Sequence, residues 1–284
     1  MTSFVKSHGL GNDYIVLDGR DLGFPLKEDA VRLICDRHFG VGSDGILLSV
    51  PAEKADFGVR IFNPDGSEAE KSGNGLRILA HYLFRHGHAE GREFTVETAG
   101  GTVTCRILGT GDAVEGVSVD MGKATFSSGA IPAAGPDREV IDEAVYVDGE
   151  QIKVTAVNVG NPHCVVLVEA VDDAEVRRLG PKLENHTLFP RRTNVQLVEV
   201  RDRGHIVIGI WERGAGYTLA SGSSSCAAAA ACRRLGLVDD HVTVEMAGGN
   251  LDITINDQWE IVLTGPVEEV CHGKLSDDLM RRLT

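Results

Sequence analysis

Two short segments of the chain read as distant copies of each other, residues 71–77 and residues 220–226. Each contains a Ser-Gly step, beginning at Ser72 and at Ser221, and the two steps are 221 − 72 = 149 residues apart. Each step precedes a stretch that reads as a helix, and a helix N-terminus presents N–H groups without intrahelical partners and a partial positive charge. Helix capping alone accounts for Ser and Gly at such positions. Their repetition predicts a duplicated architecture with two anion cradles, which together would grip a small carboxylate.

The length of 284 residues predicts two domains of ordinary size. We place the first half at residues 1–118, completed by residues 265–284, and the second half at residues 119–264. Many of the 34 glycines separate short runs of alternating or β-branched residues, a pattern typical of a turn-rich protein made largely of strands. Residues 129–142, which are rich in Pro and Ala, indicate a loop just inside the second half.

Hydrophobic periodicity predicts the individual elements. We expect strands over residues 4–7, 13–18, 45–50, 57–62, 94–98, 102–107, 116–120, 144–147, 151–158, 163–168, 194–199, 205–211, 242–246, 251–255 and 259–264. Amphipathic patterns predict surface helices over residues 27–38, 172–179 and 275–283. By contrast, the helices expected over residues 76–85 and 226–235 are nearly apolar on every side at residues 76–83 and 227–232, which predicts one buried helix at the centre of each half.

Composition argues against several classes of function. A net charge of −14 makes nucleic acid an unfavourable partner, and no apolar run is long enough for a membrane span. The first residues lack the pattern of a signal peptide, so we expect a cytoplasmic protein. Six scattered cysteines without CxxC pairs or metal-ligand spacing indicate free thiols and no metal site. Residues 40–45 match the G-x-G-x-x-G string but lie between a predicted helix and a predicted strand, the reverse of a dinucleotide site, so we expect a turn.

Seven further motifs occur in an order and spacing that carry a resemblance. They are Gly-Asn-Asp-Tyr at 11–14, Gly-Val-Gly-Ser-Asp-Gly at 40–45, Asn-Pro-Asp-Gly-Ser at 63–67, Ser-Gly-Asn-Gly at 72–75, Gly-Asn-Pro-His at 160–163, Arg-Thr-Asn at 192–194 and Glu-Arg-Gly at 212–214. Together they resemble the diaminopimelate epimerase family from the first residues to the last strands. The resemblance implies an α+β fold of two pseudo-symmetric halves, each a curled, mostly antiparallel sheet or barrel around a central helix, with the active site between them.

The resemblance also implies an activity. Members of the family interconvert LL- and meso-diaminopimelate without a cofactor, using two cysteines on opposite faces of the substrate α-carbon: one thiolate removes a proton and the other thiol supplies one. In this chain the two cysteine positions are Ser72 and Ser221. A thiol titrates near 8.5 and its pKa falls further at a helix N-terminus, whereas an alkyl hydroxyl stays protonated at any accessible pH. Serine therefore needs a neighbouring base.

Two residues at matching positions are candidates for that base, His163 and Glu212. The alternative for His163 is a polar residue that closes an Asn-Pro turn, and for Glu212 it is a salt bridge. Cys226, five residues after Ser221, points off the required helix face and is expected in the core. Three explanations of the serines stay open: an engineered double Cys-to-Ser change, a natural branch with a working Ser pair, and loss of catalysis with binding retained. The neighbouring Tyr217 and the serine run 223–225 also depart from the family pattern, which favours a natural branch.

Substrate contacts are carried over by motif. Amide side chains would hold the amino and carboxylate groups, and turn formation is their alternative role; they are Asn12, Asn63, Asn161 and Asn194. Arg213 would pair with the distal carboxylate, for which a guanidinium fork is suited. Backbone N–H groups of the two helix N-termini, at Gly73, Asn74, Gly222 and Ser223, would hold the α-carboxylate.

These inferences predict a cofactor-independent epimerase of the diaminopimelate type, acting in lysine and cell-wall precursor synthesis. We expect a small amino-acid substrate, no nucleic-acid or membrane partner, and the homodimer that the resemblance implies. Two alternatives are a non-catalytic amino-acid-binding homologue and a racemase or α,β-eliminating enzyme for another amino acid.

Overall fold

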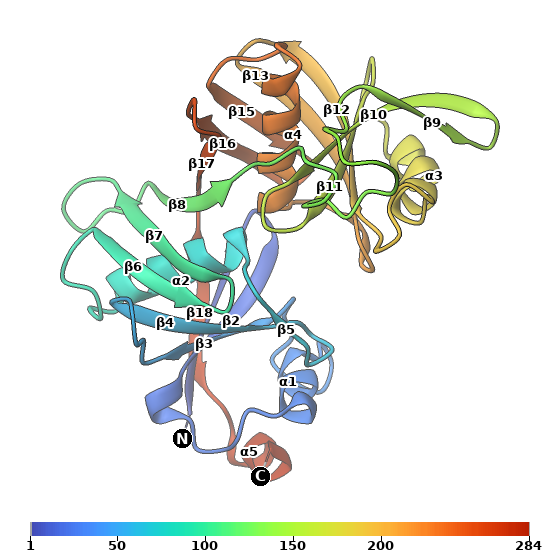
Figure 1. Ribbon diagram of the computed structural model, residues 1–284. Helices are drawn as coiled ribbons and strands as arrows, with labels where there is room; N and C mark the ends of the chain where they lie inside the picture. The colour runs from blue at the N-terminus through green and yellow to red at the C-terminus, as the bar shows by residue number, and fades with distance from the viewer. Residues whose placement is uncertain (1, 284) are drawn as a thin grey trace. The chain divides into compact units, whose positions relative to one another are not determined.

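The computed structural model describes residues 2–283, and these form two compact units. Unit 1 runs to Val119 and resumes at Gly265, and unit 2 is Asp120–Thr264. Each unit consists mainly of short strands (Figure 1). The described residues form three α-helices in unit 1 and two in unit 2. We describe the units separately.

Unit 1 is assembled from both ends of the described chain. Its strands are β1 (Ser3–Gly9), β2 (Asn12–Asp18), β3 (Ile46–Val50), β4 (Phe57–Phe62), β5 (Glu68–Ala69), β6 (Glu93–Thr98), β7 (Gly101–Leu108), the start of β8 (Gly116–Lys123), and β18 (Glu268–Lys274). Its helices are α1 (Glu28–Cys35), α2 (Gly73–Arg85) and α5 (Asp277–Leu283), with a 3-10 turn η1 (Gly19–Asp21).

Unit 2 repeats this order. Its strands are β9 (Glu143–Val147), β10 (Glu150–Asn158), β11 (Pro162–Leu167), β12 (Asn194–Asp202), β13 (His205–Glu212), β14 (Gly216–Thr218), β15 (His241–Met246), β16 (Gly249–Ile255) and β17 (Glu260–Gly265). Its helices are α3 (Asp173–Glu184) and α4 (Gly222–Arg234).

Strand pairing shows that the two units share one topology. In unit 1, β1 pairs antiparallel with β2, β2 parallel with β3, β3 antiparallel with β4, and β4 parallel with β6. In unit 2, the corresponding pairs are β10 with β11, β11 with β12, β12 with β13, and β13 with β15, in the same orientations. The central helices also correspond, because α2 and α4 each have 13 residues and begin 149 residues apart. The duplication expected from the Ser-Gly steps is therefore present in the backbone.

Each unit encloses its central helix. Helix α2 contacts β1, β2, β3 and β7, and helix α4 contacts β10, β11, β12, β13, β15 and β16 (Figure 1). Every residue of α2 from Gly73 to Leu83 is buried, and so are residues 224–232 of α4. Surface helices cover the sheets elsewhere; in unit 1, Val31 and Ile34 of α1 pack in one cluster with Ile15 and Ile46 of the sheet. These burial patterns confirm the predicted α+β fold and its two buried helices.

The predicted elements occur, with corrections at several boundaries. The helix predicted over 27–38 ends at Cys35, because the Asp36 carboxylate accepts hydrogen bonds from the backbone N–H groups of His38 and Phe39 and forms a turn. The helix predicted to stop at residue 179 continues to Glu184, and its Gly180 admits the ring of Trp211, which a Cβ there would meet at 2.5 Å. Strands β5, β14 and β18 were missed.

Other expectations concern loops, cysteines and membranes. Residues 129–142 form a loop, as predicted, with one isolated β-bridge at Glu139. Residues 40–45 contain neither helix nor strand, which agrees with the predicted turn. None of the six cysteines, all of which lie within residues 2–283, forms a disulfide, and Cys226 is fully buried in α4. Among residues 2–283, no helix is both long and apolar enough to cross a membrane.

Candidate active site

The first half-site is the N-terminus of α2 in unit 1. Ser72 is the N-cap residue, and its Oγ accepts a hydrogen bond from the Gly75 N–H at 3.0 Å. The same Oγ lies 3.4 Å from the Oη of Tyr14, which is 7% exposed. The preceding N–H groups, those of Gly73 and Asn74, have no acceptor within the helix. This terminus therefore presents two N–H donors, a hydroxyl and a neighbouring phenol.

Two asparagines fix the first turn of α2 to the sheet. The Asn74 Nδ2 donates to the Asn12 Oδ1 at 3.0 Å, and the Asn12 Nδ2 donates to the Asp44 Oδ2 at 3.1 Å. Both amides are thereby oriented. Asn74 is only 5% exposed, and its Oδ1 has no hydrogen-bond partner among the described residues. A buried acceptor in this state is suited to an ammonium or N–H donor of a ligand.

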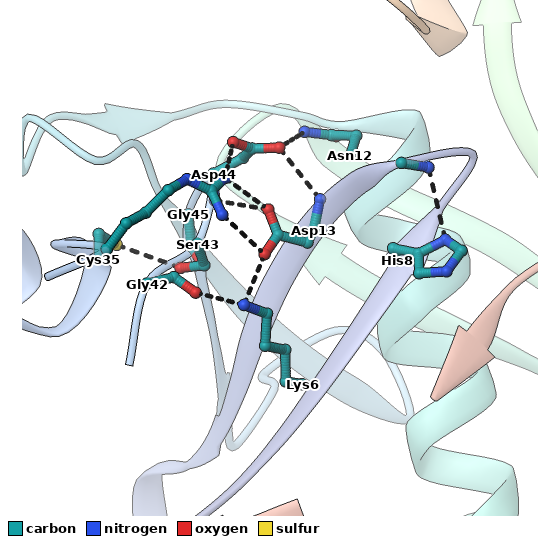
Figure 2. A network of polar contacts seen from close by, with 11 residues as sticks. Lys6, His8, Asn12, Asp13, Cys35, Gly42, Ser43, Asp44 and Gly45 are labelled. Atoms are coloured by element: carbon teal, nitrogen blue, oxygen red, sulfur yellow. Dashed lines mark hydrogen bonds and ion pairs between the residues drawn. The ribbon is translucent and has the colours of Figure 1, made fainter. Parts of the chain in front are cut away.

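A charged network supports these asparagines (Figure 2). The Asp13 carboxylate accepts from the Arg37 Nη2 at 2.9 Å and pairs with the Lys6 Nζ at 2.9 Å, and Arg37 also reaches Asp44 at 2.7 Å. Burial raises the pKa of Asp13, but hydrogen bonds from Arg37 and Lys6 outweigh it, so the pKa is lowered on balance. The network keeps Asp13 ionised and holds the strand end that carries Asn12.

The second half-site is the N-terminus of α4 in unit 2. Ser221 is its N-cap residue and is 5% exposed, but its side chain makes no capping hydrogen bond. Its carbonyl oxygen accepts from the Ser225 N–H at 3.1 Å. The N–H groups of Gly222, Ser223 and Ser224 thus lack a side-chain cap, so this terminus has one more uncapped donor than α2.

A buried polar chain runs beneath α4. The Gln196 Nε2 on β12 donates to the Ser224 Oγ at 3.0 Å, and Gln196 interacts with His163 on the neighbouring strand β11. The His163 Nε2 donates to the Asn161 Oδ1 at 2.8 Å. Burial lowers the pKa of His163 to about 3, so this imidazole is neutral and a weak base.

Asn194 and Glu184 position the loop that carries Arg213. The Asn194 Oδ1 accepts from the Arg213 backbone N–H at 2.9 Å, and its Nδ2 donates to the Pro162 carbonyl at 2.9 Å. Glu184, which is buried, accepts from the Gly214 N–H at 2.9 Å and from the Trp211 Nε1 at 2.8 Å. The Arg213 side chain itself is exposed, and its Nη1 donates to the Arg191 carbonyl oxygen at 3.4 Å.

The chain is similar in sequence to known proteins over nearly its whole length. The family model described as diaminopimelate epimerase matches residues 4–127 and 155–270. The chain is 50% identical over 277 residues to "Diaminopimelate epimerase 2" of Nostoc sp., covering 97% of this chain and 96% of the relative. It is 44% identical over 276 residues to the diaminopimelate epimerase of Moorella thermoacetica, covering 95% and 98%. The chain belongs to the diaminopimelate epimerase family.

Solved structures support the fold of this family member. A hydroxyproline epimerase from Agrobacterium vitis matches with a TM-score of 0.72 at 16% identity, covering 96% of this chain and 90% of that one. A PhzF-family protein from Bacillus anthracis matches with a TM-score of 0.69 at 18% identity, covering 97% and 99%. Identities this low indicate a shared fold only.

The remaining predicted residues lie at the ends of strands in this epimerase-family fold. Asn63 follows β4 and donates from its Nδ2 to the Ser67 Oγ at 2.9 Å, so it closes a turn. Glu212 ends β13, next to Arg213, and is half-buried. A cavity of about 570 Å³ lies at the other end of α4, where Arg233 and Arg234 are each ion-paired with acidic residues.

Sequence reasoning missed three residues of the two half-sites: Tyr14, Gln196 and Glu184. Tyr14 belongs to one of the seven motifs, and a signal for it exists. Gly11 and Gly160 are 149 residues apart, as are Tyr14 and His163, so the duplication places Tyr14 at the position that corresponds to His163. Gln196 and Glu184 fall outside the quoted motifs, and no pattern in the sequence distinguishes them from ordinary polar residues.

Proposed function

We propose that this chain interconverts LL- and meso-diaminopimelate by proton transfer at the α-carbon, with no cofactor. The proposal is carried by one observation: a chain that matches the family over nearly its whole length has a serine at the N-cap position of two helices that are equivalent in a duplicated fold. We assign proton transfer on one face of the α-carbon to Ser72 and on the other face to Ser221. Both hydroxyls lie where the helix dipole favours negative charge.

The proposed binding roles follow the two half-sites. The substrate α-carboxylate is held by N–H groups of Gly73, Asn74, Gly222 and Ser223, which are open at the helix N-termini. Arg213 binds the distal carboxylate through its exposed guanidinium.

The four asparagines divide into two kinds. Asn12 and Asn194 act mainly by positioning, since both ends of each amide bond within their own unit. In Asn63 and Asn161, one amide end is hydrogen-bonded to a side chain of the described residues, and we assign the other end to the ligand. The Asn74 Oδ1 adds a buried acceptor for the substrate ammonium.

Glu212 and His163 differ as helpers of the serines. His163 is neutral and buried, so we assign it to orienting Asn161 and Gln196. Glu212 is half-buried beside Arg213 and is the carboxylate that we assign to proton transfer on the side of unit 2. We further propose that the protein is a cytoplasmic homodimer that acts in lysine synthesis. Size-exclusion chromatography with light scattering tests whether it is a dimer.

Incubation with LL- or meso-diaminopimelate in D₂O tests the proposal. We expect the other epimer to form with deuterium at its inverted α-carbon. Tight binding of diaminopimelate without any exchange would instead favour a non-catalytic binding protein, an alternative motivated by hydroxyls at both cysteine positions. Exchange with another amino acid, and none with diaminopimelate, would reassign the substrate.

A further inference from the structure

Tyr14 is a titratable group in contact with the hydroxyl at the first half-site. Its Oη lies 3.4 Å from the Ser72 Oγ, and the residue is 7% exposed. A phenol in a model peptide titrates near 10, whereas an alkyl hydroxyl ionises far above any accessible pH. Of the two oxygens, the phenol is therefore by far the more readily ionised.

The fold builds a slot for this ring. Tyr14 lies on β2 opposite Ser7 of β1, and on its other side β2 runs parallel to β3. A Cβ at Gly45, just before β3, would lie 2.6 Å from the Tyr14 Cε1. The same Cβ would lie 2.5 Å from the Phe62 carbonyl oxygen, so a side chain at position 45 would clash with the backbone of β4 on one side and with the Tyr14 ring on the other.

We propose that Tyr14 is the positioning residue that makes Ser72 a competent base, by accepting its hydroxyl proton. This inference rests on the proposed function. The Gly75 N–H already donates to the Ser72 Oγ, which leaves the hydroxyl hydrogen of Ser72 available to point at the Tyr14 Oη. Tyr14 thereby supplies the base that a serine needs and that a thiolate would not have needed.

The proton transfers balance as follows. Tyr14 first loses its phenolic proton to water. As the substrate Cα–H bond breaks, its proton forms a new O–H bond with Ser72 Oγ, and the original hydroxyl proton of Ser72 passes to the phenolate of Tyr14. The electron pair of the broken bond stays on Cα and delocalises into the substrate carboxylate. Reversal of these steps with a solvent-derived proton produces α-proton exchange.

The second half-site lacks this arrangement. The residue 149 positions after Tyr14 is His163, which occupies the corresponding strand but donates to Asn161 and interacts with Gln196. Among the described residues, the ring at this position contacts the N-cap serine in unit 1, and the corresponding ring in unit 2 bonds to an asparagine instead. It distinguishes the two faces of the proposed reaction.

The Tyr14→Phe variant tests the inference, because it removes one oxygen and keeps the ring in its slot. We expect α-proton exchange of diaminopimelate in D₂O to fall at least ~100-fold, the scale of general acid–base catalysis, with kcat reduced and the Kd for substrate unchanged. Tyr82→Phe is the matched control, since Tyr82 is also buried in unit 1 and its hydroxyl bonds to His88 at 3.2 Å. It should exchange at the native rate.

A second background separates a relay from a structural role. In the Ser72→Cys, Ser221→Cys variant the thiolate needs no relay, so adding Tyr14→Phe should change exchange by less than ~3-fold, and the two effects should be non-additive. An equal loss from Tyr14→Phe in both backgrounds would overturn the inference, and so would a native chain that fails to exchange while the cysteine variant does. If neither background exchanges diaminopimelate, the proposed function itself fails.

Discussion

The N-termini of α2 and α4 share a backbone but use their serines differently. The cap residues have nearly the same dihedral angles, φ −142° and ψ 118° at Ser72 against φ −151° and ψ 122° at Ser221. Yet the Ser72 hydroxyl caps its helix and touches a phenol, whereas the Ser221 hydroxyl makes no cap bond. The duplicated fold therefore sets where each hydroxyl lies, and the side chains around it set what it can do.

The supports of the two termini differ as well. In unit 1, a charged network supports the first turn of α2. Each of its members, Asp13, Asp44, Arg37 and Lys6, is paired with an opposite charge. Unit 2 uses uncharged groups directly beneath α4 and places its buried carboxylate, Glu184, under the Arg213 loop. The two sides should thus respond differently to mutation and to pH.

Restoring both thiols should produce the largest effect. The Ser72→Cys, Ser221→Cys variant replaces hydroxyls with groups that ionise near neutral pH at a helix N-terminus, so epimerisation should rise by ~10²–10⁴-fold. Each single change sharpens the comparison: Ser221→Cys should gain more than Ser72→Cys, because Ser72 already has the phenol beside it. A coupled assay of diaminopimelate turnover measures this, and equal gains from the two single variants would contradict the asymmetry.

Removing the carboxylate of Glu184 should give the next largest effect. Glu184→Ala leaves the Trp211 Nε1 and the Gly214 N–H without their acceptor, which should cost about 3 kcal/mol of unfolding free energy. Glu175→Ala is the control, because its exposed pair with Arg178 should contribute less than about 1 kcal/mol. Urea denaturation measures both, and a loss at Glu184 no larger than at Glu175 would remove its anchoring role.

Much of the fold could be predicted from the sequence, and the reason is local periodicity. The strand β4 was predicted at its observed bounds, because its apolar residues alternate and Asn63 and Pro64 follow it directly. The starts of α2 and α4 were placed late, at residues 76 and 226, since the Ser, Gly and Asn of a first turn have low helix propensity. Strand β18 was missed because nearly all of it is exposed and it has no apolar alternation.

The site was predictable only where motifs mark it. The Ser-Gly steps locate both helix N-termini, but the contact of Tyr14 with Ser72 joins residues 58 positions apart and depends on the room left by Gly45. The low pKa of His163 depends on complete burial, which its motif does not reveal. Contacts that depend on tertiary packing are absent from a single sequence.

Acidification should affect unit 2 before it affects the Asp13 network of unit 1. The pKa of His163 is lowered by burial from 6.5 to about 3, so the folded chain binds fewer protons than the unfolded chain in this range, and stability falls as pH falls from 6.5 to 3. At pH 5 the loss should be roughly 2 kcal/mol. Asp13, whose pKa is lowered from 3.8, gives stability that is lost only as pH falls below 3.8.

Urea denaturation at pH 7 and pH 5 checks this order. The His163→Gln variant should lose clearly less stability between the two pH values than the native chain does. His81 in unit 1 has a pKa lowered mainly by burial, so a His81→Gln variant is the comparison and should flatten the profile less. Identical pH dependence in the native chain and in His163→Gln would show that this imidazole is not held neutral.

The smallest effect concerns capping itself. Ser72→Ala removes an acceptor for the Gly75 N–H and should destabilise the chain by about 1 kcal/mol, whereas Ser221→Ala should change stability by less than about 0.5 kcal/mol. Thermal or urea unfolding of the two variants measures the difference. A larger loss at Ser221 would reverse the comparison.

The most direct test of the central claim follows deuterium into each epimer of diaminopimelate with single-serine variants. The native chain should place deuterium at the α-carbon of the product formed from either epimer, and Ser72→Ala and Ser221→Ala should each abolish inversion while retaining substrate binding. Unchanged inversion in either variant would contradict the account, because it would mean that one of the two helix N-termini takes no part in the proton transfer.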